Sequence, residues 1–357
     1  MNDNKRQNPF LPPHLNRRAL LKTLGLIGAA IAANGAGELL DAIARDETVR
    51  DVPASQVTGD MPTRPLGKTG LTVSALCFGG AHLGRIEDDT AAIRLLHEAI
   101  DAGITFMDNA WEYNGGRSEE LMGRGLQGRR HQVVLMTKVC SHGRDKQVAM
   151  QQLEESLRRL KTDYVDLWQI HEVIYDSDPD RHFGSGGAAE ALLEAKRQGK
   201  VRFIGFTGHK HPQIHLKMLA HDFPFDTCQM PLNVFDGTYH SFEREVLPVV
   251  NRRGIAAIGM KSLSGNGDPV KRGVLNPEEA LRYVLSLPVA TVVTGIDSPQ
   301  VLRQNLDIAR RFEPMTASDM DILRQRFASY AKDGRFELFK TSDRFDGHIG
   351  RVQQGLG

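Results

Sequence analysis

Val133-Val-Leu-Met-Thr-Lys138 is a short apolar run, followed by a helical stretch and then by Tyr164-Val-Asp-Leu-Trp-Gln-Ile170. Both runs have the length and the β-branched or aromatic content of buried strands. Between them, from Met150 to Leu160, leucines recur at intervals of three and four residues, which indicates a helix. A strand, a helix and a second strand in this order favour parallel pairing through a right-handed crossover.

The same alternation continues in both directions from this unit. The other strand-like runs are Ser74–Phe78, Thr105–Asp108, Val201–Phe206, Thr227–Met230, Ile255–Met260 and Ala290–Thr294, which makes eight with the first two. Eight strand–helix units in roughly 250 residues match a (β/α)8 TIM barrel. A doubly wound open sheet is the main competitor, but it normally carries G-x-G-x-x-G after its first strand. The glycines from Gly79 to Gly84 do not have that spacing, so an α/β fold of the barrel type is predicted.

The predicted barrel domain, residues 64–330, includes a short extra element at each of its ends. Turn glycines between apolar residues from Pro65 to Val73 predict an N-terminal hairpin that caps the bottom of the barrel. Apolar residues on one face of Ala317–Tyr330 predict an extra C-terminal helix. Residues 45–63 are polar and are interpreted as a linker, whereas the charged tail 331–357 has too little periodicity for a structural prediction.

Residues 1–44 have the pattern of a twin-arginine (Tat) export signal. Arg17 and Arg18 precede a Gly/Ala-rich apolar run from Thr23 to Ala33, which is shorter than the about 20 residues of a membrane span. Two small-x-small sites, Ala30-Ile-Ala32 and Ala42-Ile-Ala44, are equally good candidates for cleavage. We expect export to the periplasm or secretion by the Tat machinery, without stable membrane insertion. The alternative is a basic extension on a cytoplasmic protein.

The composition is that of a soluble globular protein. The 357 residues are 40% hydrophobic and 25% charged, with a formal net charge of +1, so no basic face for nucleic acid is expected. The three cysteines, Cys77, Cys140 and Cys228, are widely spaced in apolar runs and are expected to be buried hydrophobes. A monomer or a small homo-oligomer is compatible with this composition.

Polar residues at the ends of the predicted strands could form a proton donor. Asp108, Lys138 and His171 end the second, third and fourth runs, and Tyr113 follows Asp108 in a loop. Each alone has an ordinary structural explanation, but active sites of barrels lie at these strand ends. A tyrosine with a pKa of about 10 is a poor acid at neutral pH. We expect the Lys138 ammonium to lower that pKa, Asp108 to hold Lys138, and His171 to orient a carbonyl oxygen.

The motifs around these residues resemble those of the aldo-keto reductase family, from Arg64 to Arg311. The most specific are Pro65-Leu-Gly-Lys-Thr-Gly70, Asp108-Asn-Ala-Trp-Glu-Tyr113, Gly116-Arg-Ser-Glu119, Leu135-Met-Thr-Lys138, Val165-Asp-Leu-Trp-Gln-Ile-His171 and Gly199-Lys-Val-Arg-Phe-Ile-Gly205. The family's catalytic tetrad maps onto Asp108, Tyr113, Lys138 and His171. The resemblance implies reversible NAD(P)H-dependent reduction of a small aldehyde or ketone, with the nicotinamide across the barrel mouth.

The resemblance also implies cofactor contacts. Gln229 matches the residue that binds the nicotinamide carboxamide, while Thr207 and Met260 stand where the family usually has a serine and a stacking aromatic. Phosphate and adenine contacts fall on Lys261, Ser262, Gly295, Ser298, Gln304 and Asn305. Gly295 and Val301 stand where many members that prefer NADPH have basic residues for its 2′-phosphate, so the site residues do not favour NADPH. NADPH is expected over NADH on family habit alone. Trp111 and His209 are expected to line the substrate pocket.

Two other functions remain open from the sequence. One is a cofactor-binding, non-catalytic member with a regulatory or redox-sensing role. The other is a metal-dependent barrel lyase or hydrolase that uses His82, His142, His171 and His209. No H-x-H or H-E-x-x-H spacing occurs among these histidines, so no metal is expected.

Overall fold

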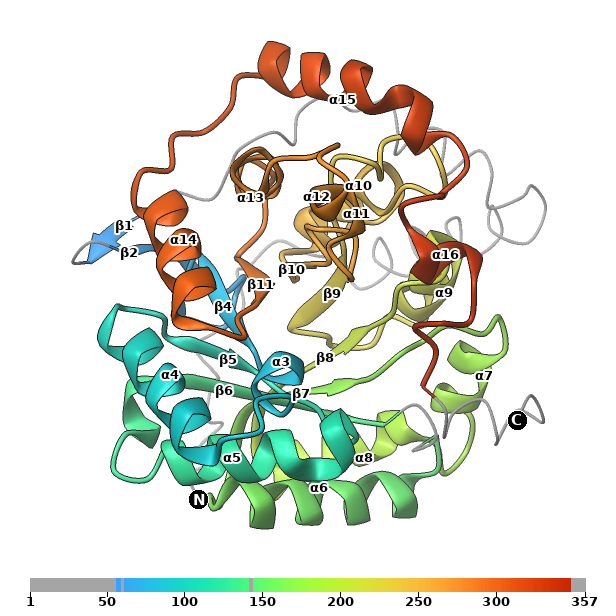
Figure 1. Cartoon of the computed structure of the whole chain (residues 1–357). Coiled ribbons are helices and arrows are strands. Elements are labelled where there is room, and N and C mark those ends of the chain that lie inside the picture. The colour runs from blue at the N-terminus through green and yellow to red at the C-terminus, as the bar shows by residue number, and fades with distance from the viewer. Residues whose placement is uncertain (1–55, 59–60, 141–143, 348–357) are drawn as a thin grey trace, which may run out of the picture. The chain divides into compact units, whose positions relative to one another are not determined.

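A computed structural model describes residues 56–58, 61–140 and 144–347, all within one compact unit of the chain. Its centre is a closed barrel of parallel strands (Figure 1). The strands are β4 (Leu76–Gly79), β5 (Phe106–Asp108), β6 (Val134–Val139), β7 (Val165–Ile170), β8 (Val201–Thr207), β9 (Thr227–Pro231), β10 (Ala256–Met260) and β11 (Thr291–Gly295). They neighbour one another in chain order, and β11 closes against β4. The predicted barrel is therefore confirmed. The predicted signal and most of the predicted linker lie outside the described residues.

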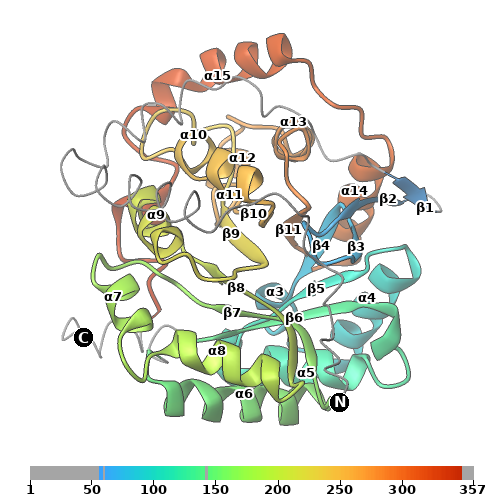
Figure 2. The same ribbon diagram turned by 180° about the vertical axis from the view of Figure 1, so that it is seen from behind.

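Helices surround the barrel, as views from both sides show (Figures 1 and 2). The longer ones are α4 (Asp89–Asp101), α5 (Arg117–Gly125), α6 (Lys146–Leu160), α8 (Ala188–Arg197), α9 (Pro212–Ala220), α11 (Leu247–Arg253), α13 (Pro277–Leu285) and α14 (Pro299–Arg310). Shorter helices are α3 (Gly80–Leu83), α7 (Asp178–Phe183), α10 (Phe242–Glu245) and α12 (Asp268–Lys271). Asp88 and Asp145 cap α4 and α6 by accepting hydrogen bonds from their first backbone N–H groups.

An N-terminal sheet closes one end of the barrel. Its strands are β1 (Gln56–Thr58), β2 (Met61–Pro65) and β3 (Thr72–Ser74), paired antiparallel. Leu66 and Val73 pack against the first residues of several barrel strands, so the predicted capping hairpin is confirmed. Gly67 has φ +55, and a Cβ there would lie 2.9 Å from the backbone N of Ala256, so this close turn requires glycine. The sheet begins at β1, within the predicted linker.

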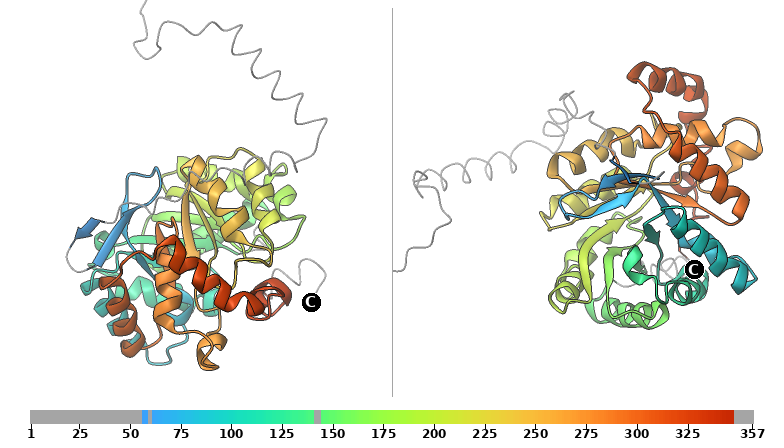
Figure 3. Two further views of the ribbon diagram at one scale, coloured as in Figure 1. Left: turned by 90° about the horizontal axis from the view of Figure 1, so that it is seen from above. Right: turned by 90° about the vertical axis from the view of Figure 1, so that its left-hand side faces the viewer.

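The C-terminal part of the chain continues beyond the barrel. Helix α15 (Ala317–Ala331) matches the predicted extra helix and packs beside α13, where Arg324 donates to the Tyr283 hydroxyl at 2.8 Å. The following segment, residues 334–347, contains α16 (Leu338–Thr341), and its Ser342 carbonyl accepts from Lys210, just before α9, at 2.6 Å. Figure 1 labels α16 and Figure 3 shows the end of the chain in two further views. We call residues 334–347 the C-terminal strap. None of the helices that the structure describes combines the length and the apolar character needed to cross a bilayer.

Candidate active site

The fold brings the four predicted catalytic residues to one end of the barrel. Asp108 is the last residue of β5, Lys138 lies near the end of β6, and His171 directly follows β7. Tyr113 begins the short 3-10 helix η1 (Tyr113–Gly116) in the loop after β5. These strands are adjacent and parallel, so their carboxyl ends place the side chains side by side.

Lys138 is the centre of this cluster. Its Nζ forms an ion pair with Asp108 and donates to the Asn109 carbonyl at 2.7 Å and to the Tyr113 hydroxyl at 3.3 Å. The side chains of Lys138 and Asp108 are 0% and 4% exposed. A buried ammonium must be paired and hydrogen-bonded, and these contacts meet that need with Lys138 in reach of the Tyr113 hydroxyl.

His171 lies on the other side of Tyr113. The two rings meet edge to face with centroids 5.5 Å apart, and His171 Nδ1 pairs with the Glu112 carboxylate. Burial acts to raise the pKa of Glu112, but His171 and its other partners outweigh it and hold that pKa below the usual value. Glu112 therefore stays ionised and orients the imidazole, a role that the sequence analysis missed although the residue adjoins Tyr113.

The expected lowering of the Tyr113 pKa is wrong for this arrangement. Burial raises the pKa of Tyr113 well above its usual value, and the carboxylates of Asp108, Glu112 and Glu172 add to the shift. The physical reason is that the charge of Lys138 is already compensated by Asp108, while desolvation disfavours the phenolate. Tyr113 is consequently held in its protonated form, which is the form that donates.

Glu172 is a second acidic residue that the sequence analysis missed. It follows His171 in a left-handed backbone conformation with φ +52, and its Oε2 accepts from the backbone N–H of Gly347 in the strap at 2.9 Å. Burial raises the pKa of Glu172 to about 7, although His171 opposes the shift. No sequence pattern marks this conformation, which for a side chain larger than glycine is strained and is common at functional sites.

The predicted nicotinamide contacts gather beside the tetrad. Gln229 Nε2 lies 3.4 Å from Asp108 Oδ2 and 3.7 Å from Met260 Sδ. Gln229 Oε1 is buried and has no hydrogen-bond partner among the described residues. Thr207, which pairs with Gln229 across β8 and β9, is also buried. An unsatisfied amide oxygen at this position suits a donor such as a carboxamide NH2 group, so these residues fit a nicotinamide.

The remaining predicted cofactor residues lie around the same end of the barrel. Lys261 has φ +57, and its ammonium lies over the rings of Phe339 and Phe345 in the strap at 5.5 and 5.3 Å. Burial lowers its pKa to about 8. Ser262 is buried next to it, and the nearby Ser264 Oγ has no partner among the described residues. The loop after β10 therefore offers a cation and a hydroxyl, both suited to phosphate oxygens.

The last unit of the barrel holds four further predicted contacts. Gly295 ends β11 so close to His82 that a Cβ would lie 2.5 Å from its ring. Ser298 caps α14 by accepting from Val301 N at 3.3 Å. Gln304 is exposed on α14, whereas Asn305 is buried. The helix N-terminus with Ser298 is of the kind that binds anions.

The two predicted pocket residues are both engaged by other parts of the protein. Trp111 Nε1 donates to Glu155 of α6 at 2.8 Å, so its indole is held by a helix outside the barrel. His209 is 3% exposed and lies 3.5 Å from Asp346 of the strap, and burial lowers its pKa to about 3. Contact with substrate stays a prediction for both residues.

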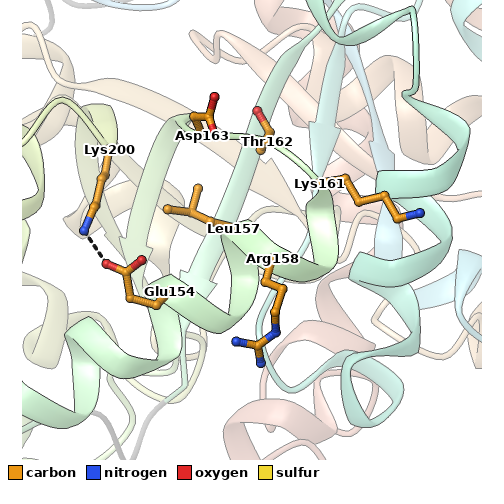
Figure 4. Close-up of a pocket in the computed structure, with 7 residues that line it drawn as sticks. All are labelled: Glu154, Leu157, Arg158, Lys161, Thr162, Asp163 and Lys200. Atoms are coloured by element: carbon orange, nitrogen blue, oxygen red, sulfur yellow. Dashed lines mark hydrogen bonds and ion pairs between the residues drawn. The ribbon is translucent and has the colours of Figure 1, made fainter.

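Other features of the described residues lie apart from this cluster. A surface hollow beside α6 is lined by Glu154, Leu157, Arg158, Lys161, Thr162, Asp163 and Lys200 (Figure 4). Residues 161–163 and 200 precede β7 and β8, so the hollow lies at the opposite end of these strands from the tetrad. All three cysteines are buried, as predicted. Within the described ranges, no three His, Cys, Asp or Glu side chains gather in a way that could hold a metal.

Comparisons with known proteins find relatives of this chain. Residues 75–267 match the model of the aldo/keto reductase family. The Bacillus subtilis protein named uncharacterized oxidoreductase YqkF is 29% identical over 70% of this chain and 91% of its own length. Aldo-keto reductase YhdN, from the same organism, is 30% identical over 56% of this chain and 61% of its own length.

Among solved structures, aldo-keto reductase AKR11C1 from Bacillus halodurans in its holo form superposes with a TM-score of 0.65. It is 28% identical to this chain, and the match covers 78% of this chain and 99% of that one. The family match spans the chain segment that contains Asp108, Lys138, His171 and Gln229. The chain belongs to the aldo/keto reductase family and is an oxidoreductase of the barrel type.

Proposed function

We propose that the protein reduces an aldehyde or ketone to an alcohol, reversibly, with Tyr113 as the proton donor. The observation that carries this proposal is the Tyr113 hydroxyl held 3.3 Å from the buried Lys138 ammonium, which is paired with Asp108. A phenol beside a fixed cation can give up its proton to an oxygen that gains negative charge. Family membership supports NAD(P)H-dependent carbonyl reduction in general terms.

Each residue of the tetrad has a separate role in the proposed reaction. A nicotinamide cofactor, when bound, supplies the hydride. Tyr113 donates its proton to the carbonyl oxygen, and the Lys138 ammonium stabilises the phenolate that forms. Asp108 keeps Lys138 in position, and His171, oriented by Glu112, hydrogen-bonds and orients the carbonyl. In the reverse direction the phenolate of Tyr113, stabilised by Lys138, accepts the proton of the alcohol.

The residues that hold the cofactor in this proposal are Thr207, Gln229, Met260, Lys261, Ser262, Gly295, Ser298, Gln304 and Asn305. Support comes from the unpaired buried oxygens of Gln229 and Ser264. We propose NADPH over NADH on the habit of the family, with Arg303 or a basic residue of another loop as the candidate for binding a 2′-phosphate. Titration with each nucleotide, followed by quenching of intrinsic fluorescence, measures the preference directly.

The substrate panel should include oxidised sugars beside simple aldehydes and quinones. Two relatives carry sugar names: L-galactose dehydrogenase of Arabidopsis thaliana, 32% identical over 56% of this chain, and 6-dehydroglucose reductase of Novosphingobium aromaticivorans, 33% identical over 43%. Glu172, which follows His171, lies at the same end of the barrel, and a carboxylate is a good acceptor for the hydroxyl groups of such substrates.

The test is carbonyl-dependent loss of NADPH or NADH absorbance. We expect turnover with at least one carbonyl, and Tyr113→Phe should lower kcat by about 100-fold or more, the scale of a lost general acid. Tyr164→Phe is the matched control because Tyr164 is a partly exposed tyrosine before β7, far along the strand from the tetrad. Nucleotide binding without turnover across the whole panel would instead favour the non-catalytic, regulatory or redox-sensing member.

We also propose that residues 1–44 direct export by the twin-arginine route to the periplasm or outside. Support comes from Arg17-Arg18 ahead of the short apolar run. A reporter fused to these residues should be exported, and replacing both arginines by lysine should retain it in the cytoplasm. Continued export of the lysine variant would contradict the proposal, and no export of either would favour a cytoplasmic protein.

A further inference from the structure

The loop that leads from Asp108 to Tyr113 is held from outside the barrel by an arginine of α6. Arg159 Nη1 donates to the Trp111 carbonyl at 2.9 Å, and its guanidinium lies 5.3 Å from the centre of the Trp111 ring. Gly116, at the end of η1, has φ +94, and a Cβ there would lie 2.6 Å from Arg159 Cζ. The glycine thus makes room for the arginine, and Arg159 touches both ends of the segment that contains Tyr113.

Arg159 is itself fixed by two carboxylates. Its Nη1 lies 3.2 Å from Glu119 and its Nη2 lies 3.5 Å from Glu155. Glu155 also accepts the indole N–H of Trp111, so carboxylate, arginine and tryptophan form a closed set of contacts. A guanidinium suits this task because its planar fork can serve a carbonyl and two carboxylates at once.

The second carboxylate connects this set to the strand that carries the catalytic lysine. Glu119 is fully buried, and its Oε1 accepts from Thr137 Oγ1 at 2.6 Å. Thr137 precedes Lys138 in β6. Burial raises the pKa of Glu119, while its bonds to Thr137 and Arg159 act in the opposite direction. The contacts therefore run from the Tyr113 loop through Arg159 and Glu119 to β6.

The loop needs such support because of its backbone. Asn114, Gly115 and Gly116 have φ values of +54, +65 and +94, so three residues in succession leave the right-handed helical and extended regions. Glycine and asparagine adopt this conformation more readily than other residues, but a turn with this backbone is neither a regular helix nor a strand, and contacts from outside the loop have to place it. The hydrogen bond from Lys138 to Tyr113 is long, at 3.3 Å, so it does not fix the tyrosine alone.

We infer that Arg159 is a positioning residue, which sets the placement of the Tyr113 hydroxyl relative to Lys138 through Trp111, Gly116 and Glu119. This inference rests on the proposed function, since Tyr113 must be the proton donor for its placement to matter. The contacts of Arg159 described above are to Trp111, Gly116 and the two carboxylates, so its effect on Tyr113 is transmitted through the loop and through Glu119. It also accounts for the sequence motif Gly116-Arg-Ser-Glu119, whose first and last residues both contact it.

The test compares Arg159→Met with Arg130→Met. Arg130 is a close match: its side chain is 18% exposed against 19% for Arg159, it pairs with a buried carboxylate (Asp166, 2.8 Å), and it lies over an aromatic ring (Tyr164, 4.5 Å). It lies at the start of β6 and β7, away from the tetrad.

We expect Arg159→Met to lower kcat by about 10- to 100-fold, the scale of a small misplacement. KM and the nucleotide Kd should stay within about threefold, and Arg130→Met should leave kcat within about twofold.

A second readout does not depend on activity. Loss of Arg159 should expose Trp111 and so increase acrylamide quenching of tryptophan fluorescence, whereas Arg130→Met should not. Arg159→Lys serves if the methionine variant fails to fold, because lysine keeps a charge near Glu119 but cannot reach the Trp111 carbonyl and both carboxylates together. It should show the same loss of kcat with unchanged KM.

Three results would overturn the inference: equal losses of kcat in the two methionine variants, an unchanged kcat in Arg159→Met, or unchanged Trp111 quenching. Failure of the proposed function looks different. In that case the wild-type protein turns over no carbonyl, or Tyr113→Phe retains full activity, whatever the Trp111 quenching shows.

Discussion

In the resting site, Lys138 carries a positive charge and Tyr113 carries the proton that can be donated. Lys138 and Asp108 are almost fully buried, and the Asp108 carboxylate compensates the charge of the Lys138 ammonium. Burial and three neighbouring carboxylates keep Tyr113 protonated. The acid is thus present across the neutral range, and Lys138 is close enough to stabilise the phenolate once a proton has left. Placement, more than a lowered pKa in the resting protein, makes this tyrosine a donor.

Glu172 gives a pH-dependent prediction at this scale. Burial raises its pKa from 4.5 to about 7, so the folded protein binds this proton more tightly than the unfolded chain does. The stabilisation is present below about pH 4.5 and is lost as the pH rises through about 7. Glu172→Gln keeps an acceptor for Gly347 N and removes the ionisation.

The difference in free energy of unfolding between Glu172→Gln and wild type should therefore grow in favour of the variant between pH 5 and 8, by at most about 3 kcal/mol. Urea titrations at both pH values measure it, with Glu87→Gln, an exposed carboxylate, as control. A difference that does not change with pH would contradict the assignment.

The sequence predicted the residues of the site better than their environment. The tetrad follows from polar residues at strand ends, since the barrel fixes where those ends meet. Glu112, Glu172 and Arg159 could not be predicted in the same way. Their roles depend on a left-handed backbone at Glu172 and on the approach of α6 to the loop, both of which arise only when distant segments pack.

The barrel strands could be predicted from the sequence. Each is a short apolar run bounded by polar residues, and the observed ends differ from the predicted ones by a residue or two, as for Ser74–Phe78 against β4 (Leu76–Gly79). The start of the N-terminal sheet was missed because β1 and β2 are short and β2 contains Pro62 and Pro65, which disfavour a strand assignment. Only their pairing with each other and with β3 makes them strands.

The hairpin between β2 and β3 should contribute stability but no chemistry. Leu66 is fully buried against the first residues of the barrel strands, so Leu66→Ala should lower the free energy of unfolding by about 2–5 kcal/mol. Because it lies at the opposite end from Lys138, nucleotide Kd should not change. Thr72→Ala, at an exposed position of the same hairpin, is the control for urea denaturation. A loss below about 0.5 kcal/mol would show that Leu66 does not close the barrel.

On the scale of the whole molecule, the barrel is closed at one end by the N-terminal sheet and contacted at the other by the C-terminal strap. The strap reaches three successive strand-end loops: Gly347 bonds to Glu172 after β7, Asp346 pairs with Lys210 after β8, and Lys340 pairs with Asp236 after β9. No periodic pattern predicts the strap, because α16 is one turn long and is held by buried charges.

Lys340 should be the main anchor of the strap. Its side chain is 0% exposed and pairs with Asp236 and Glu337, both also 0% exposed. Lys340→Met would leave two carboxylates buried without their cation, at a cost of about 3–5 kcal/mol. We expect a lower urea midpoint and faster proteolytic cleavage within residues 334–347, located by mass spectrometry. Lys332→Met, at an exposed position just before the strap, should change neither, and equal behaviour of the two variants would contradict this account.

The central claim is that Tyr113 protonates a carbonyl that receives hydride at this site. The most direct measurement uses NADPH labelled with deuterium at the transferring position of the nicotinamide, and mass spectrometry of the alcohol formed. The account predicts one deuterium at the former carbonyl carbon with wild-type protein and at least about 100-fold less labelled product in the same time with Tyr113→Phe. Unlabelled alcohol, or labelled alcohol formed equally fast by Tyr113→Phe, would contradict it.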